Sequence, residues 1–345
     1  MCGYGIVCVL YACIQRILYV QAERLEFNMK DKNIHKTSIG GQAVMEGVMM
    51  RGPKEIAIAV RKPDKEIIIE KRPISSVLQK SKILKLPIIR GCISFFESMI
   101  TGVKALMFSA EFYDLEGEEY TESKFDKWLE EKLGDKIKDV VIYFSVILSL
   151  ILSIGLFFML PNFIAELIAK ITSIQVDGTA RTLIEGAVRM AIFLAYILLV
   201  SQMKDIKRVF MYHGAEHKTI HTYERGAELT VENVRESSRL HPRCGTSFLI
   251  FVMIISVIVF MIIPTGLTWW QRALFKILLL PVVAGISYEI IKFAGRHENW
   301  FTKLISKPGM WFQYITTKEP DDSMIEVAIA SLKAVIPENK EEDKW

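Results

Sequence analysis

The sequence predicts a mainly α-helical membrane protein, a polytopic bundle of four or five spans with a small cytoplasmic α/β portion. Two observations carry this prediction. Hydrophobic residues make up 51% of the 345-residue chain and charged residues still reach 24%, which indicates a chain that lies partly in a bilayer and partly in water. Four apolar stretches also approach the length of about 20 residues that a helix needs to cross a bilayer. They cover residues 140–160, 183–203, 247–263 and 274–291.

A fifth apolar stretch, residues 4–20, leaves three explanations open. It is a fifth span, a signal sequence, or a segment that is not translated in the natural protein. A signal sequence would have a basic leader and a small-residue cleavage site, and neither is present. Residues 23–26 can be encoded by purine-rich codons resembling a ribosome-binding site. We therefore favour Met29 as the natural start, which would make residues 1–28 a non-native extension.

Residues 36–139 form the predicted cytoplasmic and interfacial domain. Within it, residues 55–61 and 66–72 are rich in β-formers and are separated by Lys-Pro-Asp-Lys, which predicts a β-hairpin. Residues 40–53 are punctuated by glycine and are interpreted as a loop leading into this hairpin. The sequence therefore predicts one hairpin and an irregular lead-in.

The stretch 88–110 has apolar residues at helical spacing but also carries Arg90, Glu97 and Lys104. These charges favour an interfacial or re-entrant helix over an ordinary span. Residues 111–139 are acidic and then mixed, which indicates a solvated linker and helix.

The distribution of basic residues predicts the topology of the membrane region, residues 140–291. The short connections 161–182 and 264–273 hold only Lys170, Arg181 and Arg272, whereas the connection 204–246 holds eight Lys and Arg. The positive-inside rule therefore places both ends of the core and the 204–246 loop in the cytoplasm. Residues 292–345 become a cytoplasmic C-terminal segment, with a charged, disordered tail from Glu338.

Several functional classes are disfavoured. A net charge of +4 is too small to indicate nucleic-acid binding, and five scattered cysteines do not form a disulfide framework. A transporter would carry more charge at the bilayer midplane and usually an internal repeat, so this class ranks last. Glu185 and Arg189, four residues apart in the second stretch, are interpreted as an internal ion pair.

The most specific chemical signal lies between residues 212 and 245, which contain four of the six histidines. No Pro or Gly lies between residue 203 and His213, so the second span is expected to continue as a helix into this region. His213, His217 and His221 would then form one stripe, because residues four apart on a helix lie one turn above each other. Two imidazoles at this spacing can bind one metal ion.

The following His241-Pro-Arg-Cys244-Gly segment adds two candidate ligands on a turn. The mixture of imidazole and thiolate favours Zn²⁺ among divalent metals, with iron or manganese as alternatives. Four protein ligands would make a closed, structural site. If one position stays with water, Glu216 is the natural proton acceptor, as in the His-x-x-Glu-His arrangement of inverted zinc proteases. The sequence leaves both possibilities open.

Two further carboxylates are candidate second-shell groups. Glu289 lies near the cytoplasmic end of the last predicted span, on the same side as the histidines. An ionisable residue in a span usually has a partner, so Glu289 is a candidate for orienting a ligand. Glu46 lies in the glycine-rich segment, for which turn chemistry alone is the alternative explanation.

The sequence contains five distinctive blocks: residues 40–53, GGQAVMEGVMMRGP; 212–219, YHGAEHKT; 239–247, RLHPRCGTS; 284–289, AGISYE; and 316–320, TTKEP. Together they resemble the YqhQ-like family of bacterial multi-pass membrane proteins. The similarity covers roughly residues 36–336. It implies a protein of the bacterial inner membrane. Members are labelled predicted metal-dependent enzymes and have no established function, so the resemblance supports the site residues without supplying an activity.

Two functional hypotheses follow, with the transporter as the third and weakest. The first is a metal-dependent hydrolase at the cytoplasmic membrane interface, acting on a lipid-linked or membrane-protein substrate, with membrane lipid as its surroundings and no nucleic-acid partner. The second is a non-catalytic scaffold or assembly factor, in which the metal only fixes the 204–246 loop. Neither hypothesis fixes an oligomeric state.

Overall fold

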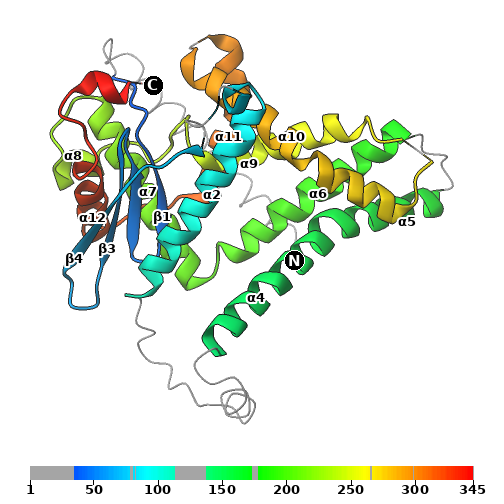
Figure 1. Cartoon of the computed structure of the whole chain (residues 1–345), viewed down its shortest axis with the longest axis horizontal. Helices are drawn as coiled ribbons and strands as arrows, with labels where there is room; N and C mark the ends of the chain where they lie inside the picture. Colours follow the sequence, from blue (N-terminus) through cyan, green and yellow to red (C-terminus); the bar gives the residue numbers. More distant parts are fainter. Residues whose placement is uncertain are drawn as a thin grey trace, which may run out of the picture.

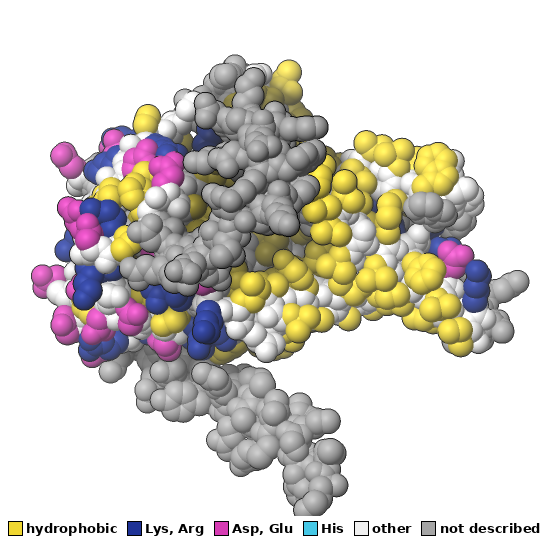
Figure 2. Space-filling model, turned by 90° about the horizontal axis from the view of Figure 1, so that it is seen from below, with side chains coloured by type: hydrophobic (Ala, Val, Ile, Leu, Met, Phe, Trp, Pro, Cys, Tyr) yellow, Lys and Arg dark blue, Asp and Glu magenta, His cyan; other side chains and the backbone are white. Residues whose placement is uncertain are grey.

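The computed structural model describes residues 35–77, 81, 83–112, 137–172, 178–264, 266–297 and 299–344. It is mainly helical with one four-stranded antiparallel sheet, which confirms the predicted fold class. The sheet and its covering helices lie at one end, and a bundle of apolar helices extends from them (Figure 1). Figure 2 shows charged side chains gathered over the first part and apolar side chains along the second. The proposed extension, residues 1–28, lies outside the described residues.

The sheet has the order β1-β2-β3-β4 and every neighbouring pair is antiparallel. The predicted hairpin is confirmed as β3, Glu55–Arg61, and β4, Ile67–Pro73. The interpretation of residues 40–53 as an irregular lead-in was wrong, because they form β1, Gly40–Val44, and β2, Gly47–Arg51.

The two central strands are buried on both faces. One face of β2 and β3 packs against helices α7, Lys204–Glu224, and α12, Asp322–Lys333. The opposite face packs against α2, Ile89–Ala110. Because alternate residues of a strand point to opposite faces, Val48 and Met50 join the first cluster while Met49 joins the second. The sheet is thus the platform on which α7 and its histidines are fixed.

Four of the described helical segments are long and apolar enough to cross a membrane, by length and composition. They support assignment as a membrane protein, and they agree in number but not in every position with the sequence prediction. They are Ile89–Ala110 in α2; Ile147–Ile168, formed by α4 (Ile137–Ile154), η4 (Gly155–Met159) and α5 (Leu160–Thr172); Gly178–Val200, which is α6; and Trp270–Arg296 in α10 (Trp269–Arg296).

Two predicted spans differ from the structure. Helix α9, Gly245–Phe260, has 16 residues, which is shorter than the predicted third span, because it ends at Phe260, ahead of Pro264. Helix α2 has the length of a span, but its C-terminal half packs on the sheet through Ala105 and Phe108. It also runs crosswise to α10 (Figure 1). The interfacial location expected for residues 88–110 stays a prediction.

The two buried charged residues of α6, Glu185 and Arg189, have partners on other helices and do not form the predicted internal ion pair. Pro161 lacks an N–H and cannot bond to the carbonyl of Phe157, four residues earlier. The side chain of Arg189 donates to that carbonyl instead, at 3.0 Å, and to Ser256 Oγ at 3.2 Å. Glu185 is paired with Lys276 of α10. Both charges therefore join different helices of the bundle.

The expected continuous helix from the second span into the histidines is interrupted. Helix α6 ends at Val200 and α7 begins at Lys204, because Met203 has an extended backbone with ψ of 137°. The side chains of Ser201 and Gln202 both donate to the carbonyl of Leu198. These polar groups satisfy a carbonyl that a continuing helix would have bonded.

The remaining described elements are three short ones and one longer helix. The short elements are η2, Ile83–Lys85; α8, Val231–Arg235; and η5, Lys340–Asp343, and the longer helix is α11, Trp300–Thr316. The prediction of a disordered tail from Glu338 was wrong, because η5 carries Asp343 into the interior. Its carboxylate accepts hydrogen bonds from Thr37 Oγ1 at 2.7 Å and Tyr223 OH at 2.8 Å. The charged sequence of this tail does not by itself show that the Asp343 carboxylate has hydrogen-bond donors in the interior.

Candidate metal centre

Three of the predicted ligands come together: His213 and His217 from α7, and Cys244 at the start of α9. One ligand atom from each lies within 4.8 Å of the others, and all three residues are buried. The two histidines are one turn apart on α7, and their ring centroids are 4.4 Å apart. Among the described residues this is the one group of histidine, cysteine and carboxylate side chains with the proximity that a metal ion requires.

The backbone orients both imidazoles. The Nδ1 atom of His213 lies 2.8 Å from the carbonyl oxygen of Thr316, and that of His217 lies 2.6 Å from the carbonyl oxygen of Arg239. A carbonyl oxygen only accepts, so both Nδ1 atoms carry hydrogen. Each Nε2 then faces the common centre. A ligand histidine in proteins is usually held in this way by its second nitrogen.

The thiol of Cys244 is activated by its surroundings. It caps the N-terminus of α9, where its Sγ accepts from the backbone N–H of Thr246 at 3.4 Å. Burial alone raises the pKa of this thiol, but the nearby His217 and His213 outweigh burial and lower the pKa well below its usual range. These histidines therefore favour the thiolate form of Cys244, which is the form that binds metal.

Without a metal, His213 and Cys244 form an imidazolium–thiolate pair. Their Nε2 and Sγ atoms are 3.2 Å apart. Burial opposes the charge of His213, but the thiolate outweighs burial and raises the pKa of this histidine to about 9. A metal ion would replace the proton between these two atoms.

Two buried polar atoms at this centre lack a hydrogen-bond partner, namely Nε2 of His217 and Oε2 of Glu216. The Glu216 oxygen lies 3.9 Å from His213 Nε2. Burial raises the pKa of Glu216, and the neighbouring His217 and His213 oppose that rise. An unsatisfied buried group usually costs about 1–3 kcal/mol, so two of them beside a thiolate are a good fit to a bound cation.

Strand β1 fixes the position of Glu216. A Cβ atom on Gly41 would lie 2.9 Å from Glu216 Cγ and 2.7 Å from the carbonyl oxygen of Met49. Only glycine allows β1 to approach this closely. Gly41, which was interpreted as part of a loop, therefore lets the strand contact the candidate centre.

His221, one turn beyond His217, is not part of the three-residue group. Its Nε2 donates to the carbonyl of Leu240 at 2.7 Å, which is the opposite tautomer to that of His213 and His217. Burial, followed by the neighbouring His241, lowers the pKa of His221 to about 3. His221 is therefore a neutral packing residue in this arrangement.

His241 also lies beside the group and not within it. Its backbone N–H and C=O are both bonded to the side chain of Gln313, at 2.8 and 2.7 Å. Its Nε2 is 3.5 Å from Glu224 Oε2. Burial, then the positive charge of Arg243, lowers its pKa well below the usual value. His241 thus orders the turn that presents Cys244.

The two predicted second-shell carboxylates have arginine partners elsewhere. Glu289 accepts from Arg90 of α2, with distances of 2.6 and 2.7 Å. Glu46, in the β1–β2 turn, accepts from Arg208 at 2.5 Å and from Tyr212 OH at 3.2 Å. Glu46 therefore contacts α7 near its start, and Glu289 joins α2 to α10.

Sequence reasoning missed the C-terminal residues that hold α7. Besides the Thr316 carbonyl, Lys318 donates its backbone N–H to the carbonyl of Phe210 at 2.8 Å. Glu319 pairs with Lys218 at 2.9 Å and with Arg239 at 3.3 Å. The signal was the Thr-Thr-Lys-Glu-Pro block, which was noted only as a resemblance.

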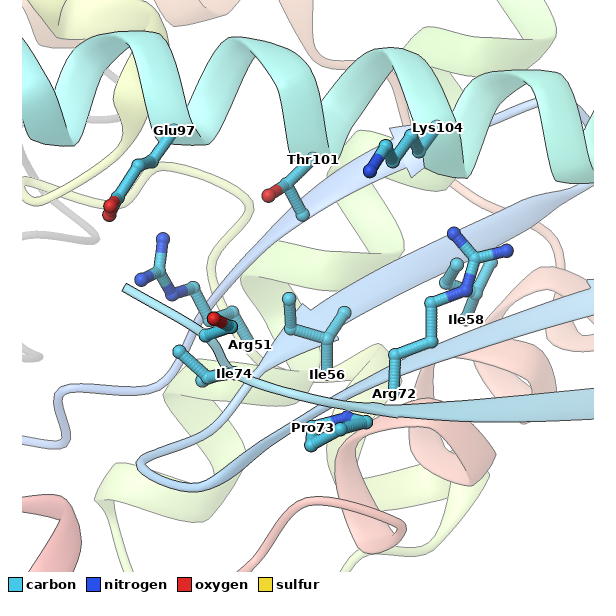
Figure 3. Close-up of a pocket in the computed structure, with 10 residues that line it drawn as sticks. Arg51, Ile56, Ile58, Arg72, Pro73, Ile74, Glu97, Thr101 and Lys104 are labelled. Carbon is cyan, nitrogen blue, oxygen red and sulfur yellow. The ribbon is translucent and has the colours of Figure 1, made fainter. Parts of the chain in front are cut away.

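A separate cavity of about 180 Å³ lies between the sheet and α2, and it contains neither histidine nor cysteine. Figure 3 shows Glu97, Thr101 and Lys104 of α2 facing Arg51 and Arg72 across it. Arg72 is paired with Glu70 at 2.8 Å. This cavity is distinct from the candidate metal centre.

Comparisons with known proteins agree with the resemblance seen in the sequence. Residues 86–338 match the model of DUF1385, a protein family of unknown function. The chain is also 38% identical over 302 residues to the uncharacterized protein YqhQ of Bacillus subtilis (strain 168), covering 86% of this chain and 92% of that protein. No solved structure matches the chain significantly. The chain therefore belongs to the DUF1385 family, together with YqhQ-like proteins whose function is unknown.

Proposed function

We propose that this protein is a metal-dependent membrane enzyme, most simply a hydrolase, that acts at the cytoplasmic face of the membrane. His213, His217 and Cys244 would hold the metal. The observation that carries the proposal is the common direction of both Nε2 atoms and the Cys244 thiolate, beside the orphaned Glu216 oxygen. The basic residues of the 204–246 segment support a cytoplasmic location.

Zinc is the metal that this donor set fits best. Two imidazoles and one thiolate suit Zn²⁺, with Fe²⁺ and Mn²⁺ as weaker alternatives. Catalytic zinc sites commonly have three protein ligands and keep a fourth position for solvent or substrate, whereas structural sites have four. The described residues offer three, which favours a catalytic centre.

Glu216 would be the general base. A bound divalent cation supplies Lewis acidity to water and to the scissile group. Oε2 of Glu216 is the one carboxylate oxygen at the centre without a hydrogen-bond partner, so it can receive the proton that water loses on attack. The Thr316 and Arg239 carbonyls hold the imidazoles in place during this step.

Cobalt substitution tests this proposal. Co²⁺ bound by Cys244 should give a thiolate-to-cobalt absorption band that Cys244→Ser removes. Azide added to the cobalt protein should shift the visible bands if the fourth position is open. An absent thiolate band would contradict the ligand set.

The alternative is a scaffold whose metal only stabilises the 204–246 loop. A closed fourth position, unresponsive to azide, would support it. The same cobalt spectra therefore separate a catalytic from a structural site. Glu216→Gln provides the matched control, because it should keep the thiolate band while removing the proposed base.

A further inference from the structure

A large cavity lies between α2, α9 and α10, and Cys244 forms part of its wall. Its volume is about 840 Å³, and Thr246 lines it beside Cys244. Ligand sites in proteins are usually about 300–1,000 Å³, so this volume is enough for a sizeable molecule. Anything bound here would lie next to the candidate metal centre. We call it the α2–α10 cavity.

Its walls are mostly apolar. Met99, Val103 and Leu106 come from α2, and Phe248 and Leu249 come from α9. Met99, Val103 and Leu249 are 51%, 54% and 40% exposed, so apolar side chains face this space without protein covering them. A hydrocarbon chain would pack against these side chains through van der Waals contacts.

The end of α10 brings positive charge to the same cavity. Lys292 and Arg296 both line it, and they are one turn apart at the C-terminus of this helix. Among the described residues, no carboxylate forms an ion pair with either of them, and Glu289, three residues before Lys292, is paired with Arg90. The other two cations of the lining, Arg243 and Lys344, are paired with Glu224 and Glu341. Two cations without an ion-pair partner in the described part of the chain, beside the apolar walls of the α2–α10 cavity, complement an anionic head group on a hydrocarbon chain.

Helix α2, which forms one wall of the cavity, is held in place by contacts with α10 and with strand β1. Arg90 of α2 pairs with Glu289 of α10. Beside this pair, a Cβ atom on Gly91 would lie 2.8 Å from the carbonyl oxygen of Gly285, which shows how closely the two backbones approach. Further along the helix, Gln42 of β1 abuts Gly102. Between these contacts Phe95 of α2 packs on Phe248 of α9, with ring centroids 5.2 Å apart, and both rings form part of the cavity wall.

We propose that the α2–α10 cavity binds an anionic membrane phospholipid, with its phosphate at Lys292 and Arg296 and an acyl chain between α2 and α9. The inference that this cavity binds lipid does not depend on the proposed function. The inference that this lipid is also the substrate rests on the proposed function, because it uses the position of Cys244 in the cavity wall.

The test uses phosphatidylglycerol that carries a photoreactive diazirine on one acyl chain, with the full-length protein in nanodiscs. Cross-links should map to α2 near Met99 and Val103 and to α9 near Leu249. Unlabelled phosphatidylglycerol should compete at least tenfold better than phosphatidylcholine, since membrane cations distinguish the two by charge. Lys292→Gln/Arg296→Gln should reduce cross-linking about tenfold.

Three further variants separate the possible failures. Lys303→Gln/Lys307→Gln removes two exposed charges from neighbouring α11 and should leave cross-linking unchanged. Val103→Trp should reduce it by filling the cavity, whatever the head group. His217→Ala should keep full cross-linking, because His217 does not line the cavity. Loss of metal binding alone would therefore defeat the proposed function without affecting this inference.

Equal competition by the two lipids, or cross-links spread evenly over α4, α5 and α6, would overturn the proposal. A polypeptide recovered in the cavity in place of lipid would also overturn it.

Discussion

His217→Ala and His221→Ala should destabilise the metal-free protein to a similar extent. Only His217→Ala should remove the stabilisation of the folded protein by zinc. The two histidines are one turn apart on α7 and both are buried. Each donates to a loop carbonyl, Arg239 at 2.6 Å and Leu240 at 2.7 Å. In chelator, either variant should lose about 1–3 kcal/mol of stability from the unsatisfied carbonyl and the lost packing.

With zinc present, the two variants should separate. A metal that binds only the folded protein stabilises it by about 2.7 kcal/mol at a hundredfold excess over its Kd. His217→Ala should abolish this gain, because its Nε2 is one of the three converging ligand atoms. His221→Ala should keep the gain, because His221 does not belong to the group of three converging ligands.

The assay is thermal unfolding of the detergent-purified protein, with chelator and with excess zinc. His221→Ala losing the zinc-dependent rise in Tm as completely as His217→Ala would refute the assignment of ligands. A rise that survives in His217→Ala would refute it as well.

Three other substitutions test the contacts around the site, each read as a change in unfolding free energy in mild detergent. Gly41→Ala should cost about 1–3 kcal/mol, because the new methyl group must displace Glu216 or the neighbouring strand. Glu185→Gln should cost about 3–5 kcal/mol, because it leaves Lys276 buried without its counter-charge. Asp343→Asn should cost about 1–3 kcal/mol, because a buried carboxylate that accepts several hydrogen bonds becomes a poorer acceptor.

Each of these has a matched control in the chain. A Cβ on Gly40 meets nothing within 4 Å, so Gly40→Ala should be nearly neutral. Glu166 and Glu341 have side chains 47% and 70% exposed, so their replacement by glutamine should change stability little. If a control substitution lowers the free energy of unfolding as much as its matched test substitution, the physical reason given for the test site is wrong.

The sequence predicted well what local patterns encode. The hairpin of β3 and β4 follows from alternating β-formers around a proline turn, and the His213–His217 spacing follows from helical geometry. Cys244 could be named because a short turn motif accompanies it. These features depend on residues close together in the chain.

Features set by distant contacts could not be predicted. Strand β1 looked like a loop because its glycines are explained only by the approach to Glu216. By helical spacing alone, His221 and His217 are equivalent candidate ligands. Their tautomers differ because His217 donates from Nδ1 to the carbonyl of Arg239, whereas His221 donates from Nε2 to the carbonyl of Leu240. Likewise, the partner of Glu289 is Arg90, 199 residues away in the sequence.

Metal content measures the central claim most directly. The protein, purified without chelator and analysed for elements, should contain about one zinc ion for each chain, as expected for one set of three ligands. His213→Ala and Cys244→Ser should each lose it, while His241→Ala should retain it. Folded wild-type protein that takes up no divalent metal from equimolar solution, or that keeps its zinc after Cys244→Ser, would contradict the account.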